Sequence, residues 1–438
     1  MVYDLRQAAI LALTTLWLGC HAPQEAVQEP TSEPAEENEN IGEAIENEFP
    51  AVPELESIRA KIDPNCSENG CIQAVEYFGA YDTVTLNEVI PLGVNILNGY
   101  SVWQVTYVTH NRQARATITL PFETNPPENG YHIVLNNPLT VGFASRCASG
   151  SSAGAAGLAA QFGAYGMIGV SVDYPGLGTE GSHPYLVAQS EAMSTLDGAR
   201  ATLEFMEHAN VPISNRLAFA GLSQGGHATL SAAAMHAEYA PELDIRAFAA
   251  AAPSNLFLEQ WTPYIETDGY HLTFYALIAY AWSLHYGYET GGIFYETRRT
   301  EIENAISTLC LFEEDETAAT LWDALGTVAN EIFSVEFIES FSAGNLESFP
   351  ALETGFEQNR VVPFNQTAPI KIYQGTWDYT VPPEATQSMI ESLRSGGMDI
   401  LYEEIPLSGH LNTAFGYIIT YQLAAESSRN WLKGQLDL

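Results

Sequence analysis

Short apolar runs alternate with stretches of helical composition, and this alternation constrains the fold more than any other feature of the chain. The runs with the character of strands are 101–123, 132–137, 167–176, 216–221, IRAFAAAAPS, IKIYQGTWD and LYEEIPLSGH. The first of them predicts two strands around the polar turn His110 to Gln113. Helical stretches rich in small residues, such as HATLSAAAMHAEYA, separate the later runs. Strands that alternate with helices predict an α/β fold, with a mostly parallel sheet covered by helices on both faces.

Two stretches match G-x-S-x-G, the pattern of the nucleophile elbow in serine hydrolases. GSSAG at 150–154 follows the polar residues SRCAS, so we interpret Ser152 as a chance match in a loop. GLSQG at 221–225 follows the apolar residues LAFA and precedes a helix of small residues. A nucleophile elbow needs this order of strand, turn and helix, because the tight turn lifts the hydroxyl above the sheet. Ser223 is therefore the predicted nucleophile.

A serine nucleophile needs a base, and the base needs an acid that orients it. In sheets of this type the chain order is serine, acid, histidine. His410 follows the strand-like run at 401 and is the predicted base. Asp378 ends the run IKIYQGTW and is the predicted acid, although it could instead cap a helix that starts near Pro383. His227 lies only four residues from Ser223 and is expected to be a packing residue.

The oxyanion of an acyl-transfer intermediate needs backbone N–H donors. The residue after the nucleophile supplies one in this fold, so we expect the N–H of Gln224 to serve. The second donor should come from the loop after the run at 132–137. Thr140 or one of its neighbours could supply it.

The N-terminus predicts export. Residues 8–18 are apolar apart from threonine, which suits the core of a signal peptide and is too short to span a bilayer. The run ends at Leu18-Gly19-Cys20, which resembles a bacterial lipoprotein box with Cys20 as the lipidated residue. Residues 21–50 contain nine Glu and no Lys or Arg, which predicts a disordered acidic linker. We therefore expect a signal peptide at 1–20, a linker at 21–50 and a folded domain at 51–438.

The net charge of −38 excludes some partners. Such a surface repels nucleic acid and anionic membranes, so nucleic-acid binding is not expected. No Cys-x-x-Cys or paired-histidine spacing indicates a zinc site, and we expect neither a metal nor an organic cofactor.

Five cysteines agree with an oxidising compartment. If Cys20 carries lipid, four remain for two disulfides. Cys66 and Cys71 flank the turn-forming residues SENG and can pair locally. This leaves Cys147 and Cys310 as the second pair.

The stretch DYPGLGTEGSHPYLV at 173–187, with SEAMSTLDGARA after it, resembles the secretory lipase, or lipase A-like, family of α/β-hydrolases. GLSQGGHA, GTWDYTVP and the SGH loop are similar to that family as well, and the resemblance covers roughly residues 85 to 435. It implies an α/β-hydrolase fold with a helical cap and a disulfide like Cys147–Cys310. An HGT-like oxyanion loop is replaced here by Asn137-Pro138-Leu139-Thr140. The short tail after His410 predicts that the long C-terminal flap of some members is missing.

The cap is also visible in the spacing of the strands. The chain between the runs that end at Ser254 and begin near Ile370 is too long for a connection, which predicts a helical insert at about 255–365. Aromatic residues are frequent in it, and some of them, such as Trp261 and Trp282, could line an acyl or aryl pocket above Ser223. Six residues are predicted to share one helical face: Tyr270, Phe274, Leu277, Ile278, Ala281 and Leu284.

The sequence as a whole predicts an exported serine hydrolase that cleaves carboxylic esters, a lipase or esterase of lipid catabolism, through an acyl-enzyme intermediate. A peptidase or amidase on the same fold is the alternative enzyme, because the triad is the same for both bonds. A surface-tethered binding protein with a vestigial site is the alternative that is not an enzyme. A small ester or lipid is the expected partner, with a possible lipid anchor in a bacterial membrane, and a monomer is favoured.

Overall fold

A computed structural model describes residues 52–89, 97–123, 125–148, 156–313, 317–410 and 430–436. The predicted signal peptide and acidic linker, Cys20 and Ser152 lie outside these residues, as does most of the tail after His410. No helix within the described ranges is long and apolar enough to cross a membrane.

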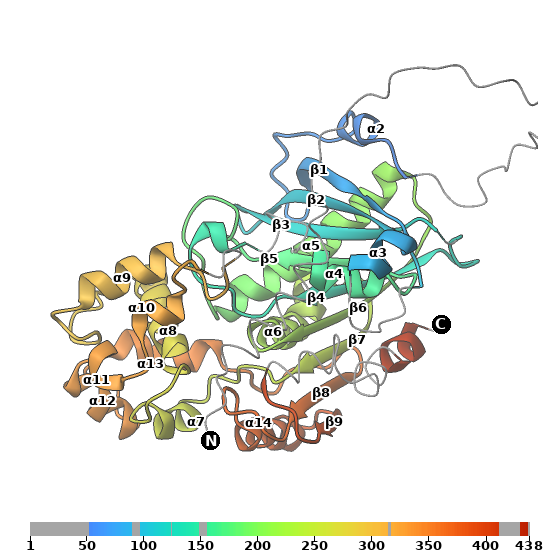
Figure 1. The fold of residues 1–438 in the computed structure, drawn as a ribbon. Coiled ribbons are helices and arrows are strands. Elements are labelled where there is room, and N and C mark those ends of the chain that lie inside the picture. Colours follow the sequence, from blue (N-terminus) through green and yellow to red (C-terminus); the bar gives the residue numbers. More distant parts are fainter. Residues whose placement is uncertain are drawn as a thin grey trace, which may run out of the picture.

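A nine-stranded sheet forms the centre of the molecule (Figure 1). Its spatial order is β1-β2-β3-β5-β4-β6-β7-β8-β9. The strands from β5 to β9 in this order are parallel, and β1, β2 and β3 are antiparallel to their neighbours. The bounds are β1 Ile72–Tyr81, β2 Tyr100–Thr109, β3 Arg112–Pro121, β4 Tyr131–Asn137, β5 Ile168–Asp173, β6 Ile213–Leu222, β7 Asp244–Ala251, β8 Ile370–Gly375 and β9 Ile400–Ile405. The predicted mixed, mostly parallel sheet is confirmed.

Helices cover both faces of the sheet, because side chains along each strand alternate between the two faces. In β6, Leu217 and Phe219 belong to the larger apolar core, whereas Ala218 and Ala220 belong to a second core on the opposite face. Side chains of α2, α5, α6 and α14 join the first core, and those of α4 and residues 430–436 join the second. The bounds of these helices, and of the short helix α3, are α2 Leu55–Arg59, α3 Thr83–Val89, α4 Ala156–Gly163, α5 Ala188–Ala209, α6 Gln224–Tyr239 and α14 Pro383–Ser395.

The edge strand β1 is the strand that the sequence pattern missed. It pairs with β2 alone, and bulges interrupt its register on both sides of Tyr77. Several of its side chains, including Glu76, Tyr77 and Phe78, are exposed. The strand therefore lacks the apolar alternation by which a half-buried strand is recognised. The Cys66–Cys71 disulfide closes the turn that leads into it.

The chain between β7 and β8 forms a group of helices at one end of the sheet (Figure 1). They share a third apolar core, which also includes Phe143 and residues 185–187 from loops of the sheet. The bounds are α7 Leu258–Trp261, α8 Leu272–Tyr286, α9 Arg299–Thr308, α10 Leu321–Leu325, α11 Ala329–Ile332, α12 Val335–Ser342 and α13 Pro350–Asn359. This group is called the cap below.

The predicted face of α8 is right only in part. Leu277, Ile278 and Ala281 are buried, but Leu284 is half exposed, and Tyr270 lies before the helix. The prediction assumed one apolar face and one polar face. In the structure α8 is the central helix of the cap and is buried on most sides, so a single apolar face does not describe it.

The Cys147–Cys310 disulfide joins the loop after β4 to the cap. Around it, Gly142 and Cys310 form an isolated β-bridge, and the amide of Leu311 donates to the Val141 carbonyl at 2.9 Å. Arg146 adds an ion pair to Glu313, with Nη2 2.6 Å from Oε1. The cap is therefore attached covalently to the loop that carries Thr140.

Replacing Cys147 and Cys310 together by Ala should lower the free energy of unfolding by about 2–5 kcal/mol. The bond closes a loop of 163 residues, which restricts the unfolded chain far more than the five-residue separation of Cys66 and Cys71 does. Urea unfolding of both double variants measures the difference. A larger loss in the Cys66/Cys71 variant would contradict this account of the cap.

Candidate active site

Ser223 occupies a strained turn between β6 and α6. Its φ of 57° and ψ of −115° lie where residues other than glycine are uncommon. Backbone bonds hold this conformation: the Ser223 amide donates to Ala251, and its carbonyl accepts from His227 and Ser254. The strand-turn-helix arrangement predicted for GLSQG is present, with Ser223 at the carboxyl end of a central parallel strand.

Gly221 and Gly225 are required by the crowding of this turn. A Cβ at Gly221 would lie 2.1 Å from the Gly225 carbonyl oxygen, and a Cβ at Gly225 would lie 2.0 Å from the Asn137 carbonyl oxygen. No side chain fits at either distance. The first turn of α6 is therefore packed directly against the backbone at the end of β4, where the predicted oxyanion loop begins.

Asp378 and His410 are hydrogen bonded, with Asp378 Oδ2 2.8 Å from His410 Nδ1. The carboxylate is buried, and its other oxygen accepts the amides of Thr380 at 2.9 Å and Val381 at 2.8 Å. The alternative role of Asp378 as a helix cap is wrong, because α14 begins at Pro383 without any side-chain cap. The backbone bonds fix the carboxylate so that it faces the histidine.

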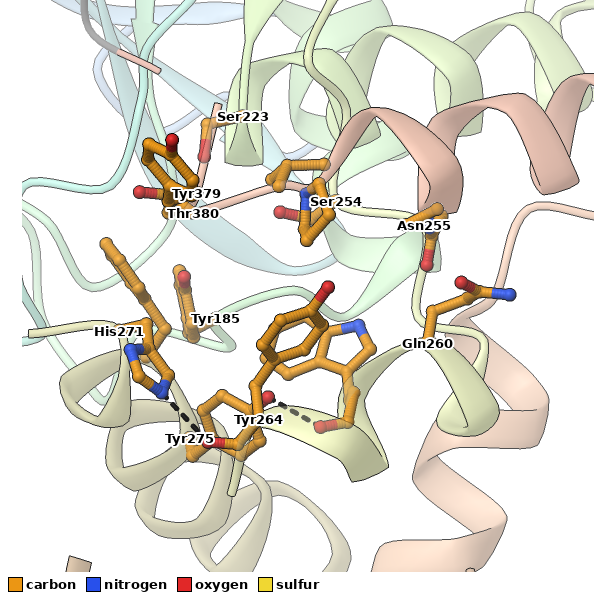
Figure 2. Close-up of a pocket in the computed structure, with 15 residues that line it drawn as sticks. Tyr185, Ser223, Ser254, Asn255, Gln260, Tyr264, His271, Tyr275, Tyr379 and Thr380 are labelled. Atoms are coloured by element: carbon orange, nitrogen blue, oxygen red, sulfur yellow. Dashed lines mark hydrogen bonds between the residues drawn. The ribbon is translucent and has the colours of Figure 1, made fainter. Parts of the chain in front are cut away.

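A pocket that is open to solvent lies between Ser223 and the cap. Figure 2 shows Ser223 beside Tyr379 and Thr380 at one end, with Tyr264, His271 and Tyr275 of the cap at the other. Thr380 follows Asp378 closely in the chain, so the loop of the acid forms part of the pocket wall. The Ser223 hydroxyl makes no hydrogen bond to His410 within the described part of the chain. Catalytic hydrogen bonds are often long in the absence of substrate.

The cap aromatics divide into two groups. Trp261 and Phe274 line the pocket. Trp282 is fully buried in the cap core and donates its indole N–H to the Tyr185 carbonyl at 3.0 Å. The sequence could not separate these groups, because all three residues belong to the same aromatic-rich insert.

The two predicted oxyanion residues lie in segments that approach each other: Gln224 begins α6, and Thr140 follows the end of β4, whose Asn137 carbonyl oxygen lies close to Gly225. The amides of Gln224 and Thr140 have no hydrogen-bond partner among the described residues. The Thr140 hydroxyl lies 2.9 Å from the hydroxyl of Tyr185, which lines the pocket. Burial raises the pKa of Tyr185 well above its usual range, so this phenol stays neutral.

A buried polar cluster beside Ser223 was missed by the sequence analysis. His227, expected to be a packing residue, is hydrogen bonded through Nδ1 to Glu191 Oε2 at 2.6 Å. The other carboxylate oxygen of Glu191 accepts from the Gln224 side chain at 2.9 Å. The one sign of this cluster in the sequence is Glu191, an acidic residue among the small and apolar residues at the start of α5. Its partners Gln224 and His227 lie more than 30 residues away in the chain, so no local pattern identifies them.

Known proteins resemble the chain in sequence and in structure. The model of the secretory lipase family matches residues 158–261, which contain the PGLGT stretch and the elbow. The resemblance to secretory lipases is confirmed. This match supports a carboxylic ester hydrolase as the class of enzyme. No curated protein matches the chain.

Solved structures share the fold. The rice cell wall degrading esterase LipA from Xanthomonas oryzae superposes with a TM-score of 0.67 at 19% identity, covering 84% of this chain and 99% of that one. A putative hydrolase from Legionella pneumophila gives 0.68 at 20% identity, covering 83% and 98%. Candida antarctica lipase A in its closed state gives 0.58 at 17% identity, covering 80% of each chain. These likenesses establish the α/β-hydrolase fold.

Replacing Gly225 by Ala should destabilise the protein and lower its activity together. The new Cβ forces α6 away from β4, and overpacking of this kind costs about 1–3 kcal/mol. Gly434→Ala is the matched control, because no atom of the described residues beyond its own helical segment lies within 4 Å of the added Cβ. Thermal unfolding and ester turnover measure both effects. Equal stability and activity in the two variants would contradict the close packing of the elbow.

Proposed function

We propose that this protein hydrolyses carboxylic esters with Ser223 as nucleophile, His410 as general base and Asp378 as the residue that orients the base. The observation that carries this proposal is the strained turn of Ser223 in the wall of an aromatic pocket. The same wall includes Thr380 and Val381, whose amides bind Asp378 of the hydrogen-bonded Asp378–His410 pair. The match to the secretory lipase family supports the ester bond as the target.

The Asp378–His410 bond supports the role of His410 as base. Because the carboxylate accepts a hydrogen from Nδ1, Nε2 keeps its lone pair and can take the proton of the serine hydroxyl. The alkoxide attacks the ester carbonyl, and the imidazolium then protonates the leaving alcohol. Water then attacks the acyl-enzyme and gives its proton to His410, and the imidazolium returns that proton to the leaving Ser223 oxygen, which releases the acid and regenerates the hydroxyl.

We assign the backbone amides of Gln224 and Thr140 as the hydrogen-bond donors to the oxyanion of each tetrahedral intermediate. The Gln224 amide at the start of α6 has no partner among the described residues, and this supports the first assignment. The positive end of the helix dipole there also favours the oxyanion. The approach of the β4 loop to Gly225 supports the second. Pro138 has no N–H, so Thr140 is preferred over it.

The pocket favours neutral esters with a sizeable apolar group. Its walls carry the rings of Tyr185, Trp261, Tyr264, Phe274 and Tyr275. Burial of apolar area contributes about 25 cal/mol per Å². With a net charge of −38, the protein repels anionic substrates.

We also propose the location and organisation of the chain. The family and the two disulfides suggest export. The signal peptide at residues 1–20 would direct export, and Cys20 would carry the lipid. The acidic tether at 21–50 would then hold the hydrolase domain of residues 51–438 away from a bacterial membrane. This domain, with its cap at about 255–365, is proposed to be a monomer.

Ser223→Ala should lower the turnover of a p-nitrophenyl ester by roughly 10⁶-fold, because the nucleophile is removed. Ser152→Ala is the control and should keep most activity. Parallel assays with an aminoacyl p-nitroanilide distinguish an amidase. Full ester turnover by folded Ser223→Ala would refute the proposal, and a wild-type protein inactive on all these substrates would favour a binding protein.

Phe274→Ala should shift the preference for acyl or aryl size, because this side chain lines the pocket without belonging to the fully buried cap core. The ratio of kcat/KM between short and long p-nitrophenyl esters measures the shift. Trp282→Ala should destabilise the cap, since its ring is fully buried. A size profile that is unchanged in folded Phe274→Ala and Trp261→Ala would show that substrate binds elsewhere.

A further inference from the structure

The side chain of Gln224 is held by two hydrogen bonds in the interior of the protein. Its Nε2 lies 2.9 Å from Glu191 Oε1 and 3.1 Å from His183 Nε2. All three residues are about 1% exposed. The two hydrogens of the amide group therefore each have an acceptor when His183 is neutral and carries its ring hydrogen on Nδ1.

The His183 ring meets the first of these conditions, because it is neutral. Burial lowers the pKa of its ring to about 3, so the ring is uncharged at neutral pH. It stacks on Tyr174, with ring centroids 5.6 Å apart. The acceptor for Gln224 is thus fixed in place by the loop between β5 and α5.

Glu191 binds the same loop as well as Gln224. Its Oε1 accepts the backbone amide of Leu186 at 3.1 Å. Leu186 has a φ of 51°, a left-handed conformation that costs energy in a branched residue. The preceding residue, Tyr185, reaches the Thr140 hydroxyl at 2.9 Å. One carboxylate oxygen is therefore linked to Gln224 directly and to Thr140 through Tyr185.

His227 holds the second oxygen of Glu191. Its Nδ1 lies 2.6 Å from Glu191 Oε2, and its Nε2 lies 2.7 Å from the Asn359 carbonyl, an acceptor at the end of α13 in the cap. Two acceptors require either a hydrogen on both ring nitrogens or a proton on Glu191. In both cases a hydrogen lies between His227 Nδ1 and Glu191 Oε2, and this bond holds the carboxylate against Gln224 and Leu186.

We propose that Glu191 is a positioning residue for the oxyanion hole, which aligns the Gln224 amide through the Gln224 side chain and the Thr140 loop through Leu186 and Tyr185. This inference rests on the proposed function, because it assumes that the two amides stabilise the oxyanion. The carboxylate is too deeply buried to touch substrate. It acts on the reaction only through the backbone that it holds.

Gln224→Met tests this role and keeps the backbone N–H and the length of the side chain. We expect kcat to fall roughly 10- to 100-fold, part of the effect of losing an oxyanion donor, while KM stays within about twofold. Affinity for a phenylboronic acid, which forms a tetrahedral adduct, should fall by the same factor as kcat. A residue that only stabilises the fold would not lower transition-state affinity selectively.

Glu191→Ala should reproduce this pattern, and Glu191→Gln should largely restore activity. In Glu191→Gln the carbonyl of the new side-chain amide can accept from Gln224 and Leu186, and its NH₂ can donate to a neutral His227. The losses in Glu191→Ala and Gln224→Met should not multiply in full in the double variant, because both variants release the Gln224 amide. If Glu191→Ala does not fold, Gln224→Met and Glu191→Gln still decide the matter.

Thr202→Val is the matched control. Thr202 is buried in α5, the helix of Glu191, and its hydroxyl donates to the Gly198 carbonyl of the same helix, so kcat should stay at the wild-type value. Wild-type kcat and boronate affinity in folded Gln224→Met would overturn this inference, as would a loss confined to KM. If the inference about Glu191 fails but Ser223→Ala is inactive in the same series, the proposed function still stands. If Ser223→Ala is active, the proposed function itself fails.

Discussion

The strained turn at Ser223, where the backbone φ is positive, is the constraint on which the rest of the site depends. The left-handed conformation of this residue is unfavourable by itself and persists only because neighbouring backbone holds it. β6 and β7 supply that backbone on one side, and the close approach of Gly225 to the Asn137 carbonyl supplies it on the other. The same packing that strains the serine brings two amides without a partner among the described residues, those of Gln224 and Thr140, to the carboxyl end of the sheet.

The cap is joined to this arrangement at several points and does not simply lie above it. Cys310 is bonded to Cys147 in the loop after β4, Trp282 is hydrogen bonded to the Tyr185 carbonyl, and the carbonyl of Asn359 binds His227. Each contact reaches a segment beside Ser223. The geometry of the pocket and the geometry of the nucleophile are therefore coupled, and a change in the cap can alter turnover as well as substrate choice.

The parts of the molecule that the sequence predicted are those with a strong local pattern. The strand β6 and the small-residue helix after it identify Ser223, and the prolines after Asp378 mark the end of a strand. The edge strand β1 has no such pattern, because much of it is exposed. Glu191 was not recognised because its partners, Gln224 and Leu186, are joined to it by tertiary packing that no local spacing records. Local pattern thus identified the catalytic candidates but not the residues that hold them in place.

Trapping the acyl-enzyme tests the central claim most directly. The wild-type protein is mixed with a p-nitrophenyl ester at steady state, quenched in acid and digested, and the peptides are examined by mass spectrometry. With a substrate whose deacylation limits the rate, the account predicts about one acyl group per chain, carried by Ser223 and absent after Ser223→Ala. An acyl group on Ser152 or another residue, or turnover without any covalent intermediate under conditions where deacylation limits the rate, would contradict it.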